Sequence, residues 1–496
     1  MPRRVGFDND KYIELQTERI RERVHEFGGK LYLEFGGKLF DDYHASRVLP
    51  GFEPDSKIRM FLQLKDELEI VIAINASDIE KNKKRGDLGI TYDDDVFRLI
   101  DAFRALGFLV DSVCITRYTG QPSADAFINR LKKSGIRSYL HYPIEGYPYD
   151  VKKIVSEDGY GKNQYIKTSR PLVLVTAPGP GSGKMATCLS QLYHENKRGV
   201  QAGYAKFETF PIWNLPLKHP VNIAYEAATA DLDDVNMIDH FHLDAYGKAA
   251  VNYNRDIEVF PVLKAIMESI MGSSPYQSPT DMGVNMAGFC IVDDEVCRQA
   301  SKMEVWRRYY KTLVSIRKGE AEDVERVRIE RLMQQLDIDA GFCPAVKVSL
   351  EKAEATNAPA AAMVLPDGRI VTGKNSTLLG PSAALLLNAV KLLAGIPKEV
   401  KLVSPQALEP ICHLKTEHLK NHNPRLHSDE VLIALSISSI TNPVAEMAMQ
   451  QLDKLKDCDA HFTTILSPVD VNTYKKLGIN VTCEPKYQLK KLYHAK

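Results

Sequence analysis

A short loop rich in glycine and proline carries the clearest chemical signal in this chain. The loop runs from Gly179 to Lys184, follows the apolar run Leu172–Val175 and precedes a helical pattern over Met185–Glu195. Small residues let backbone N–H groups close around an anion, the N-terminal end of the following helix is electropositive, and one lysine neutralises charge. The spacing therefore predicts a phosphate-binding loop whose contacts come from Gly179, Gly181, Ser182, Gly183 and Lys184.

The loop departs from the usual P-loop pattern G-x-x-x-x-G-K-[ST] at two positions. Pro178 stands where the pattern has its first glycine, and Met185 stands where it has a Ser or Thr that binds Mg²⁺. Proline fixes φ at about −65°, and a thioether offers Mg²⁺ no oxygen ligand. A tight strand-to-helix turn that binds no ligand is the alternative interpretation of this segment.

Polar side chains are dense downstream of this loop, between Lys206 and Asp256. Lys206 and Glu208 follow the loop by one helix and one strand, and Glu208 could hold a metal ion or act as a base. We therefore assign the catalytic roles to Lys184, Lys206 and Glu208. The residues expected to complete the substrate pocket are Arg117, Asp231, His240, His242, Asn252, Asn254 and Arg255. A helix cap or a turn is the alternative role for each member of this set, and it is the commoner one.

Two further patterns bear on metal binding. The run Phe289–Asp293 has the form of an apolar strand that ends in a Mg²⁺-binding carboxylate, but apolar positions from Met286 to Ile316 also fit one long helix, which we favour. The histidines His413, His418, His422 and His427 match no zinc template. We expect no zinc, and we leave the metal open, with Mg²⁺ bound to a nucleotide as the candidate.

Strand-like and helical segments alternate through the first half of the chain. Strands are expected at 31–35, 69–75, 108–116, 138–142, 172–175 and 200–210, and helices at 11–27, 94–106, 124–133 and 185–195. Such alternation predicts an α/β fold with a mainly parallel sheet covered by helices on both faces. Ligands bind beyond the carboxyl ends of the strands in such sheets, which is where Gly179–Lys184 would lie.

The pattern changes near Leu232. Helical periodicity at 257–271, 286–316 and 321–336 predicts a helical subdomain, and the last third returns to α/β with a hairpin at 360–372, a helix at 381–393 and strands at 400–403, 461–466 and 479–483. We therefore expect an N-terminal α/β domain over 1–235, a helical subdomain over 236–345 and a C-terminal α/β subdomain over 346–496. The hairpin and the helix after it resemble the opening of the cytidine-deaminase-like fold without that family's zinc ligands.

Composition excludes some classes of function. The 496 residues are 44% apolar and 26% charged, as in globular proteins of two or three domains. Lys plus Arg equals Asp plus Glu at 64 each, so no basic field attracts nucleic acid. No run approaches the ~20 apolar residues of a membrane span, and the N-terminus lacks a signal-peptide pattern. Eight scattered cysteines without a C-x-x-C pair indicate reduced, mostly buried thiols. We expect a cytoplasmic protein whose partner is a small phosphorylated ligand, with no nucleic acid and no membrane; a homo-oligomer is compatible with the sequence.

Several motifs together resemble one bacterial family. They are Phe35-Gly-Gly-Lys-Leu39 with its continuation Asp41-Asp-Tyr-His44, the Ala177–Met185 loop, Lys206-Phe-Glu-Thr-Phe-Pro211, Asn252-Tyr-Asn-Arg255 and Ser278-Pro-Thr-Asp-Met-Gly283. The family is that of domain of unknown function 1846, also called UPF0371. The resemblance covers nearly the whole chain. It implies cytoplasmic bacterial proteins of this length with an α/β N-terminal part and a distinct C-terminal subdomain, and it implies no reaction.

Two functions are compatible with these residues. The first is an enzyme acting on a nucleotide or phosphorylated metabolite, with phosphoryl transfer the favoured reaction, because such a loop offers positioning and charge neutralisation. The alternative is a non-catalytic nucleotide or phosphate sensor, or a scaffolding protein, which needs no hydroxyl at Met185. The dense polar segment at 206–256 favours the enzyme.

Overall fold

The computed structural model describes residues 4–37, 39–40, 42–86 and 88–488. The chain divides into two compact units, residues 4–301 and residues 302–496. Lys38 and Asp41, which belong to the motif at 35–44, lie outside the described residues. None of the described helices is long and apolar enough to cross a membrane. All eight cysteines lie in the described part and are free, and seven are buried, which confirms the burial predicted for most of them.

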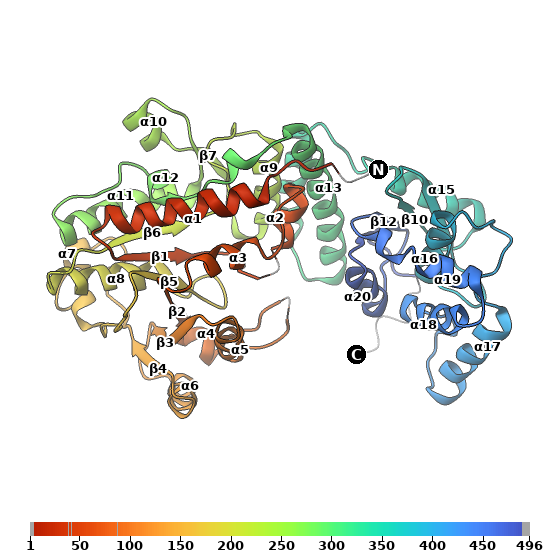
Figure 1. Cartoon of the computed structure of the whole chain (residues 1–496), viewed down its shortest axis with the longest axis horizontal. Coiled ribbons are helices and arrows are strands. Elements are labelled where there is room, and N and C mark those ends of the chain that lie inside the picture. The colour runs from red at the N-terminus through yellow and green to blue at the C-terminus, as the bar shows by residue number, and fades with distance from the viewer. Residues whose placement is uncertain (1–3, 38, 41, 87, 489–496) are drawn as a thin grey trace. The chain divides into compact units, whose positions relative to one another are not determined.

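A parallel sheet of seven strands forms the centre of the 4–301 unit (Figure 1). Its strand order is β4-β3-β2-β5-β1-β6-β9. The strands are β1 (Leu31–Phe35), β2 (Leu68–Asn75), β3 (Leu109–Thr116), β4 (Arg137–Leu140), β5 (Leu172–Thr176), β6 (Gly203–Phe207) and β9 (Gly283–Val284). Every residue of β2 and β5 is buried, as expected for central parallel strands covered on both faces. The α/β class and the parallel sheet predicted from the sequence are confirmed.

Helices and a small ribbon surround this sheet. The helices are α1 (Asn9–Glu26), α2 (Tyr43–Val48), α3 (Ser56–Gln63), α4 (Ala76–Glu80), α5 (Tyr92–Ala105), α6 (Pro122–Lys133), α7 (Val151–Ile154), α8 (Lys184–Lys197), α9 (Pro220–Ala228), α10 (His240–Tyr246), α11 (Asn254–Met271) and α12 (Pro279–Met282). Short 3-10 turns occur at Tyr160–Lys162, Ala230–Leu232 and Ala287–Cys290. Strands β7 (Asn236–Ile238) and β8 (Val251–Tyr253) form an antiparallel ribbon.

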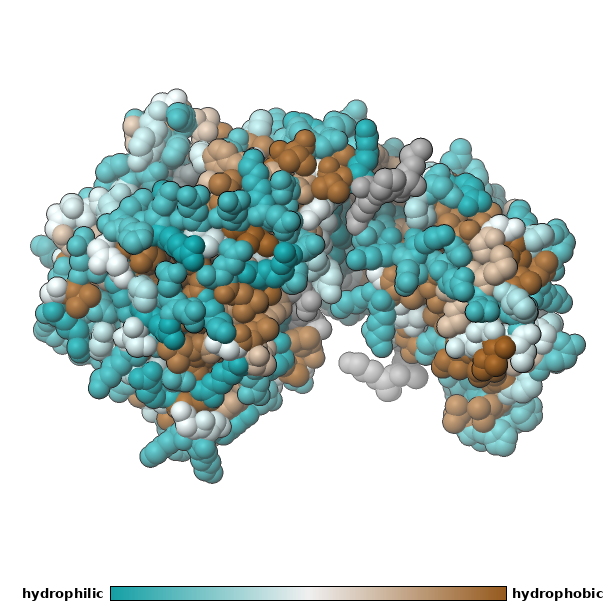
Figure 2. Space-filling view, in the orientation of Figure 1, coloured by the Kyte–Doolittle hydropathy of each residue, from teal (hydrophilic) through white to brown (hydrophobic). Residues whose placement is uncertain are grey.

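Alternation along β1 assigns the helices to the two faces of the sheet. Phe35 lies 5.8 Å from Phe61 of α3 between ring centroids, whereas the Tyr32 hydroxyl donates to Glu195 of α8 at 2.6 Å. Helix α1 contacts α3 through Thr17 and Gln63, so α1 and α3 cover one face and α8 covers the other. Figure 2 shows a mainly hydrophilic surface over α1, as expected for a helix that buries only its inner side.

The long helix predicted over Met286–Ile316 is wrong in its first part. The 3-10 turn at 287–290 is followed by an irregular segment, and α13 (Asp294–Lys318) begins only at Asp294. Ile291 pairs instead with Phe7 in an antiparallel bridge, and the Val292 N–H donates to Gly6 O at 2.9 Å. Backbone pairing with a segment far away in sequence therefore interrupts the apolar helical pattern.

The 302–496 unit contains a mixed sheet of four strands in the order β11-β10-β12-β13. Its strands are β10 (Ala360–Val364), β11 (Ile370–Lys374), β12 (Asp459–Phe462) and β13 (Asn480–Cys483). Strand β10 is antiparallel to both neighbours, and β12 and β13 are parallel. The helices of this unit are α14 (Asp323–Gln335), α15 (Pro344–Thr356), α16 (Pro381–Leu393), α17 (Pro405–His413), α18 (Ser428–Ser439), α19 (Pro443–Met449) and α20 (Pro468–Lys476), with a π-helical turn at Leu414–His418 and a 3-10 turn at Leu452–Leu455.

The outcome of the sequence predictions for this unit is mixed. The hairpin at 360–372 and the helix at 381–393 are confirmed. The strand predicted over Val400–Val403 is wrong, because that segment forms no regular structure. Leu402 and Val403 are buried in the core of the unit, so burial without backbone pairing explains their apolar character.

Asp470 ties three helix N-termini together in this unit. Its buried carboxylate, in the first turn of α20, accepts from the Ser382 hydroxyl at the start of α16 at 2.8 Å, and from the Ser428 N–H and hydroxyl at the start of α18 at 2.8 Å each. His427 Nδ1 lies 2.8 Å from its second oxygen. Burial alone would raise the pKa of Asp470, but His427 and these donors hold the pKa well below its usual range.

Replacing Asp470 by Asn is expected to destabilise the 302–496 unit by roughly 3 kcal/mol, because buried donors then lose a charged acceptor. The pKa of Asp470 is lower in the folded chain than in the unfolded chain. Its ionisation therefore stabilises the fold at pH values above the pKa of the unfolded chain, and this stabilisation is lost as the pH falls. The pKa of His427 is raised, first by its hydrogen bond to Asp470, which gives stability that is present below the unfolded value and lost as the pH rises. The difference between wild type and Asp470→Asn in calorimetry should therefore be largest between about pH 4 and about pH 6.5.

The matched control is Asp367→Asn, which removes an exposed partner of Arg369. Its melting temperature should stay close to that of the wild type, because exposed ion pairs contribute little. Equal losses in the two variants would contradict the role assigned to Asp470.

Candidate functional site

The loop Gly179–Lys184 connects β5 to α8 at the centre of the carboxyl edge of the sheet, because β5 lies between β2 and β1. Gly181 has φ of 73° and Gly183, the N-cap residue of α8, has φ of 83°. Ser182 between them keeps a negative φ. Alternation in the sign of φ turns successive N–H groups toward one side, which is the geometry of an anion-binding nest.

Three hydrogen bonds hold the loop through its carbonyl groups. Thr116 Oγ1 donates to Ser182 O at 2.8 Å, and Asn75 Nδ2 donates to Gly181 O at 3.3 Å. Ser182 Oγ donates to Gly179 O at 2.6 Å. Thr116 and Asn75 are the last residues of β3 and β2, so the neighbouring strands position the loop. Sequence reasoning missed both; the available signal was a polar residue at the end of an apolar strand.

The donor groups of the loop are left available. None of the described residues accepts a hydrogen bond from the backbone N–H groups of Gly181, Ser182 and Gly183. Lys184 forms no ion pair within the described part of the chain. Thr187 Oγ1 donates to Gly183 O at 3.0 Å and lies 3.6 Å from Cys114 Sγ, so this hydroxyl does not take the place of the one missing at Met185.

Lys206 and Glu208 lie at the carboxyl end of β6, which is separated from β5 by β1 alone. Lys206 forms ion pairs with Asp256 of α11 and, at 3.1 Å, with Glu208 Oε1. Its Nζ also lies 2.9 Å from the Tyr253 hydroxyl. Burial alone would lower the pKa of Lys206, but the charge of Asp256 and its other neighbours holds the pKa well above its usual value. Lys206 is therefore a permanent cation.

Glu208 is the carboxyl of this cluster whose pKa is raised. It is 9% exposed, and among the described residues its Oε1 has no hydrogen-bond partner, although it lies 3.1 Å from Lys206 Nζ. Burial is the largest cause that raises the pKa of Glu208 to about 7; Lys206 opposes the shift and Asp256 adds to it. A carboxyl that titrates near neutral pH can both accept and donate a proton.

Four of the remaining predicted pocket residues make contacts between segments of this unit. His242 Nδ1 lies 3.0 Å from Ser278 Oγ at the cap of α12. Asn252 Nδ2 donates to Thr280 Oγ1 at 3.5 Å. The other two residues, at the start of α11, contact the residues directly before β7. Asn254 Oδ1 accepts from the Val235 N–H at 3.0 Å, and Arg255 pairs with Asp234 at 2.6 Å. These contacts hold separate segments of the fold together, and a part in substrate binding stays a prediction for all four.

The other three predicted pocket residues, Arg117, Asp231 and His240, are exposed. Arg117 directly follows β3, and its charge lowers the pKa of Tyr147, which burial raises overall. Of the three, Arg117 alone follows a strand at the carboxyl edge of the seven-stranded sheet.

Asp293 forms part of a helix cap. Its Oδ1 accepts from the Val296 N–H at 3.2 Å. Within the described part of the chain, no group of three or more His, Cys, Asp or Glu side chains is placed to hold a metal ion.

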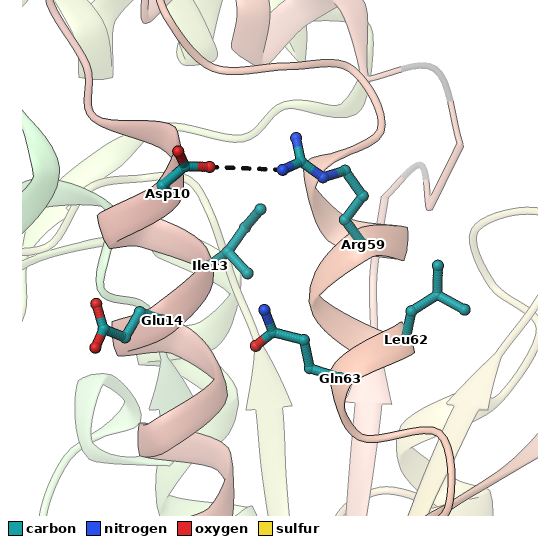
Figure 3. Close-up of a pocket in the computed structure, with 6 residues that line it drawn as sticks. All are labelled: Asp10, Ile13, Glu14, Arg59, Leu62 and Gln63. Atoms are coloured by element: carbon teal, nitrogen blue, oxygen red, sulfur yellow. Dashed lines mark hydrogen bonds and ion pairs between the residues drawn. The ribbon is translucent and has the colours of Figure 1, made fainter.

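A groove between α1 and α3 lies on the face of the sheet opposite α8. Figure 3 shows its lining by Asp10, Ile13, Glu14, Arg59, Leu62 and Gln63. Its ion pair joins Asp10 to Arg59 at 3.5 Å, and the Asp10 side chain is 90% exposed. Its charged groups are solvated, whereas Lys206 and Glu208 are largely buried, and we place the candidate site at the carboxyl edge.

Comparison with known sequences covers both units. Residues 5–337 match the family described as "Domain of unknown function DUF1846, N-terminal", and residues 342–493 match its C-terminal counterpart. A UPF0371 protein of Streptococcus pneumoniae (strain JJA) is 58% identical over 491 residues, which cover 99% of each chain. A UPF0371 protein of Streptococcus thermophilus shows the same identity and coverage, and one of Streptococcus pneumoniae serotype 2 is 59% identical, with 99% of each chain covered. These descriptions name no reaction.

Glu208→Gln is expected to stabilise the 4–301 unit at pH 8 by on the order of 2 kcal/mol. The pKa of Glu208 is higher in the folded chain than its ordinary value of 4.5. Wild type therefore loses stability as the pH rises from about 4.5 through about 7, whereas the amide has no charge to bury. Calorimetry at pH 5 and pH 8, with the exposed Glu14→Gln as control, measures the difference. A gain of the same size at both pH values would contradict the assigned pKa.

Proposed function

The chain belongs to the bacterial family of domain of unknown function 1846, the UPF0371 family, and we propose that its 4–301 unit binds a phosphorylated small molecule at Gly179–Lys184. The ligand is a nucleotide or another phosphorylated metabolite. Lys206 and Glu208 lie beside its reacting group, and phosphoryl transfer is the favoured reaction.

One observation carries this proposal. The loop has its carbonyl groups bound to Thr116, Asn75 and Ser182, while its N–H groups have no acceptor among the described residues. An anion is the partner that such N–H groups take, and the N-terminus of the 14-residue helix α8 adds a favourable dipole. Lys184, without an ion pair to a described residue, supplies the neutralising charge.

Glu208 supports turnover rather than binding alone. In phosphoryl transfer a hydroxyl oxygen of the acceptor attacks phosphorus, its proton passes to a base, and the leaving group departs with the bonding electrons. A carboxyl with a pKa of about 7 can take that proton near neutral pH. Lys206, held protonated by Asp256, adds fixed positive charge near the transferred group.

The alternative function is a nucleotide or phosphate sensor, or a scaffold, without turnover. Met185 favours it, because the P-loop hydroxyl that binds Mg²⁺ has no counterpart at that position. For either function we propose a cytoplasmic protein that does not bind nucleic acid.

For the 302–496 unit we propose a cytidine-deaminase-like topology without the zinc chemistry. The order β11-β10-β12-β13, with a hairpin and then helix α16, supports this topology. Helices α16 and α20 begin with Ser382 and Asp470 near their N-termini, where a zinc deaminase would need His or Cys ligands and a catalytic Glu.

Lys184→Ala is expected to abolish stabilisation by phosphate compounds. A ligand at 100 times its dissociation constant should stabilise wild type by about 2.7 kcal/mol, seen as a rise in melting temperature with a panel of nucleotides and phosphorylated metabolites. Lys197→Ala, at the other end of α8, is the matched control and should keep the full rise. Absence of any rise in folded wild type would reduce the loop to a structural turn.

Glu208→Gln is expected to lower turnover of the bound compound by about 10²-fold or more while leaving its thermal shift in place, because the base is lost and the loop is intact. Release of phosphate, or its transfer in the presence of Mg²⁺, is the measurement. A wild type that binds but turns over none of the compounds would instead support the sensor.

A further inference from the structure

Glu34 places a carboxylate on an interior strand of the seven-stranded sheet. Its strand β1 lies between β5 and β6, and Glu34 stands opposite Val175 on one side and Lys206 on the other. Tyr32, two residues earlier, bonds to α8, so Glu34 faces the same side of the sheet. The next residues on β5 lead into the loop Gly179–Lys184. Glu34 therefore lies between the loop and the cluster of Lys206.

The carboxylate of Glu34 keeps capacity for a cation. Its Oε2 accepts from the Tyr204 hydroxyl at 2.7 Å, and the side chain is half-buried. Among the described residues no Lys or Arg nitrogen pairs with Glu34 at ion-pair distance. Lys206, opposite on β6, is its charged neighbour, and the charge of Glu34 helps to raise the pKa of that lysine.

Cys188 locates Glu34 relative to the loop. Burial is the largest cause that raises the pKa of this thiol; the negative charge of Glu34 raises it further, and the positive charge of Lys184 lowers it. Both charges thus act on one side chain in the first half of α8. The strand register and the shared neighbour Cys188 both place Glu34 and Lys184 on the α8 side of the sheet, near the start of α8.

We propose that Glu34 is the protein ligand of a Mg²⁺ ion that also binds phosphate oxygens held by the loop, an inference that rests on the proposed function. Mg²⁺ commonly takes one or two carboxylates, substrate phosphates and water rather than a full set of protein ligands. One carboxylate is therefore enough, and it replaces the hydroxyl that is missing at Met185.

A Mg²⁺ ion with Glu34 as its one protein ligand limits which phosphorylated compounds the site can take. With a single protein ligand, the ion depends on the substrate for most of its remaining anionic oxygens. A diphosphate or triphosphate offers oxygens from two adjacent phosphates to one ion, whereas a monoester offers those of one phosphate. The substrate is accordingly a compound with a phosphoanhydride bond, bound as its magnesium complex.

Isothermal titration with inorganic pyrophosphate and with ATP, each with and without Mg²⁺, tests this role. In wild type and in the exposed control Glu14→Gln, Mg²⁺ should strengthen binding of at least one compound by about tenfold or more, a change well resolved by titration. Glu34→Gln keeps an oxygen that accepts from Tyr204. It should bind without metal at least as tightly as wild type, because a like charge is removed, and it should lose the gain from Mg²⁺. Electron paramagnetic resonance of Mn²⁺, used in place of Mg²⁺ and recorded with and without pyrophosphate, should show that Glu34→Gln loses the bound ion.

The outcomes separate the two proposals. Retention of the full Mg²⁺ gain in Glu34→Gln, or binding by wild type that Mg²⁺ does not strengthen, overturns the role of Glu34 and leaves the loop in place. Loss of metal-free binding in Lys184→Ala alone supports the loop independently. Failure of wild type to bind either compound, with or without Mg²⁺, overturns this inference together with the phosphoanhydride substrate class; if the wider phosphate panel fails as well, the proposed function falls too.

Discussion

Parallel pairing of β5, β1 and β6 is the constraint on which the candidate site depends. The register sets Leu33 of β1 opposite Leu174 of β5 and Ala205 of β6, and all three side chains are buried. This register brings the start of the phosphate loop, Glu34 and Lys206 to one edge and one side of the sheet. A slip of one residue would turn Glu34 toward α3 and bury a charge among aromatic rings, so the apolar core enforces the geometry of the polar site.

The charges at that edge bear on why the pKa of the Glu208 carboxyl is raised. Elsewhere in the same unit, buried Lys57 meets buried Asp42 at 2.6 Å, and this pairing lowers the pKa of the carboxyl against the effect of burial. In the cluster at β6, one lysine faces both Asp256 and Glu208. A single cation does not offset two neighbouring carboxylates out of water, so the second one shifts toward its protonated form. Burial is therefore the main cause of the raised pKa of Glu208, and Lys206, which also pairs with Asp256, offsets only part of it.

Glu208, the candidate functional carboxyl, contrasts with Asp470, a structural one. Both are buried, but their pKa values move in opposite directions. Asp470 accepts from Ser382 and Ser428 at the N-termini of α16 and α18 and pairs with His427, and each of these groups favours the anion. Glu208 has an oxygen that makes no hydrogen bond within the described part of the chain, and the carboxylate of Asp256 lies beside it. Groups that stabilise a fold are fully partnered, whereas groups available for chemistry keep unsatisfied capacity.

Local pattern in the sequence determined much of this protein: the strands at the centre of the parallel sheet, the loop with its lysine, and the position of Lys206 and Glu208 at the end of a strand. These follow from apolar periodicity and glycine placement, which act over a few residues. Tertiary structure alone decided the strand order that puts β1 between β5 and β6, and with it the place of Glu34. It also decided the hydrogen bonds from Asn75 and Thr116 to the loop, the interruption of the predicted helix at Ile291, and the burial of Val403 outside any strand. Each of these depends on partners far away in sequence, and no local pattern carries that information.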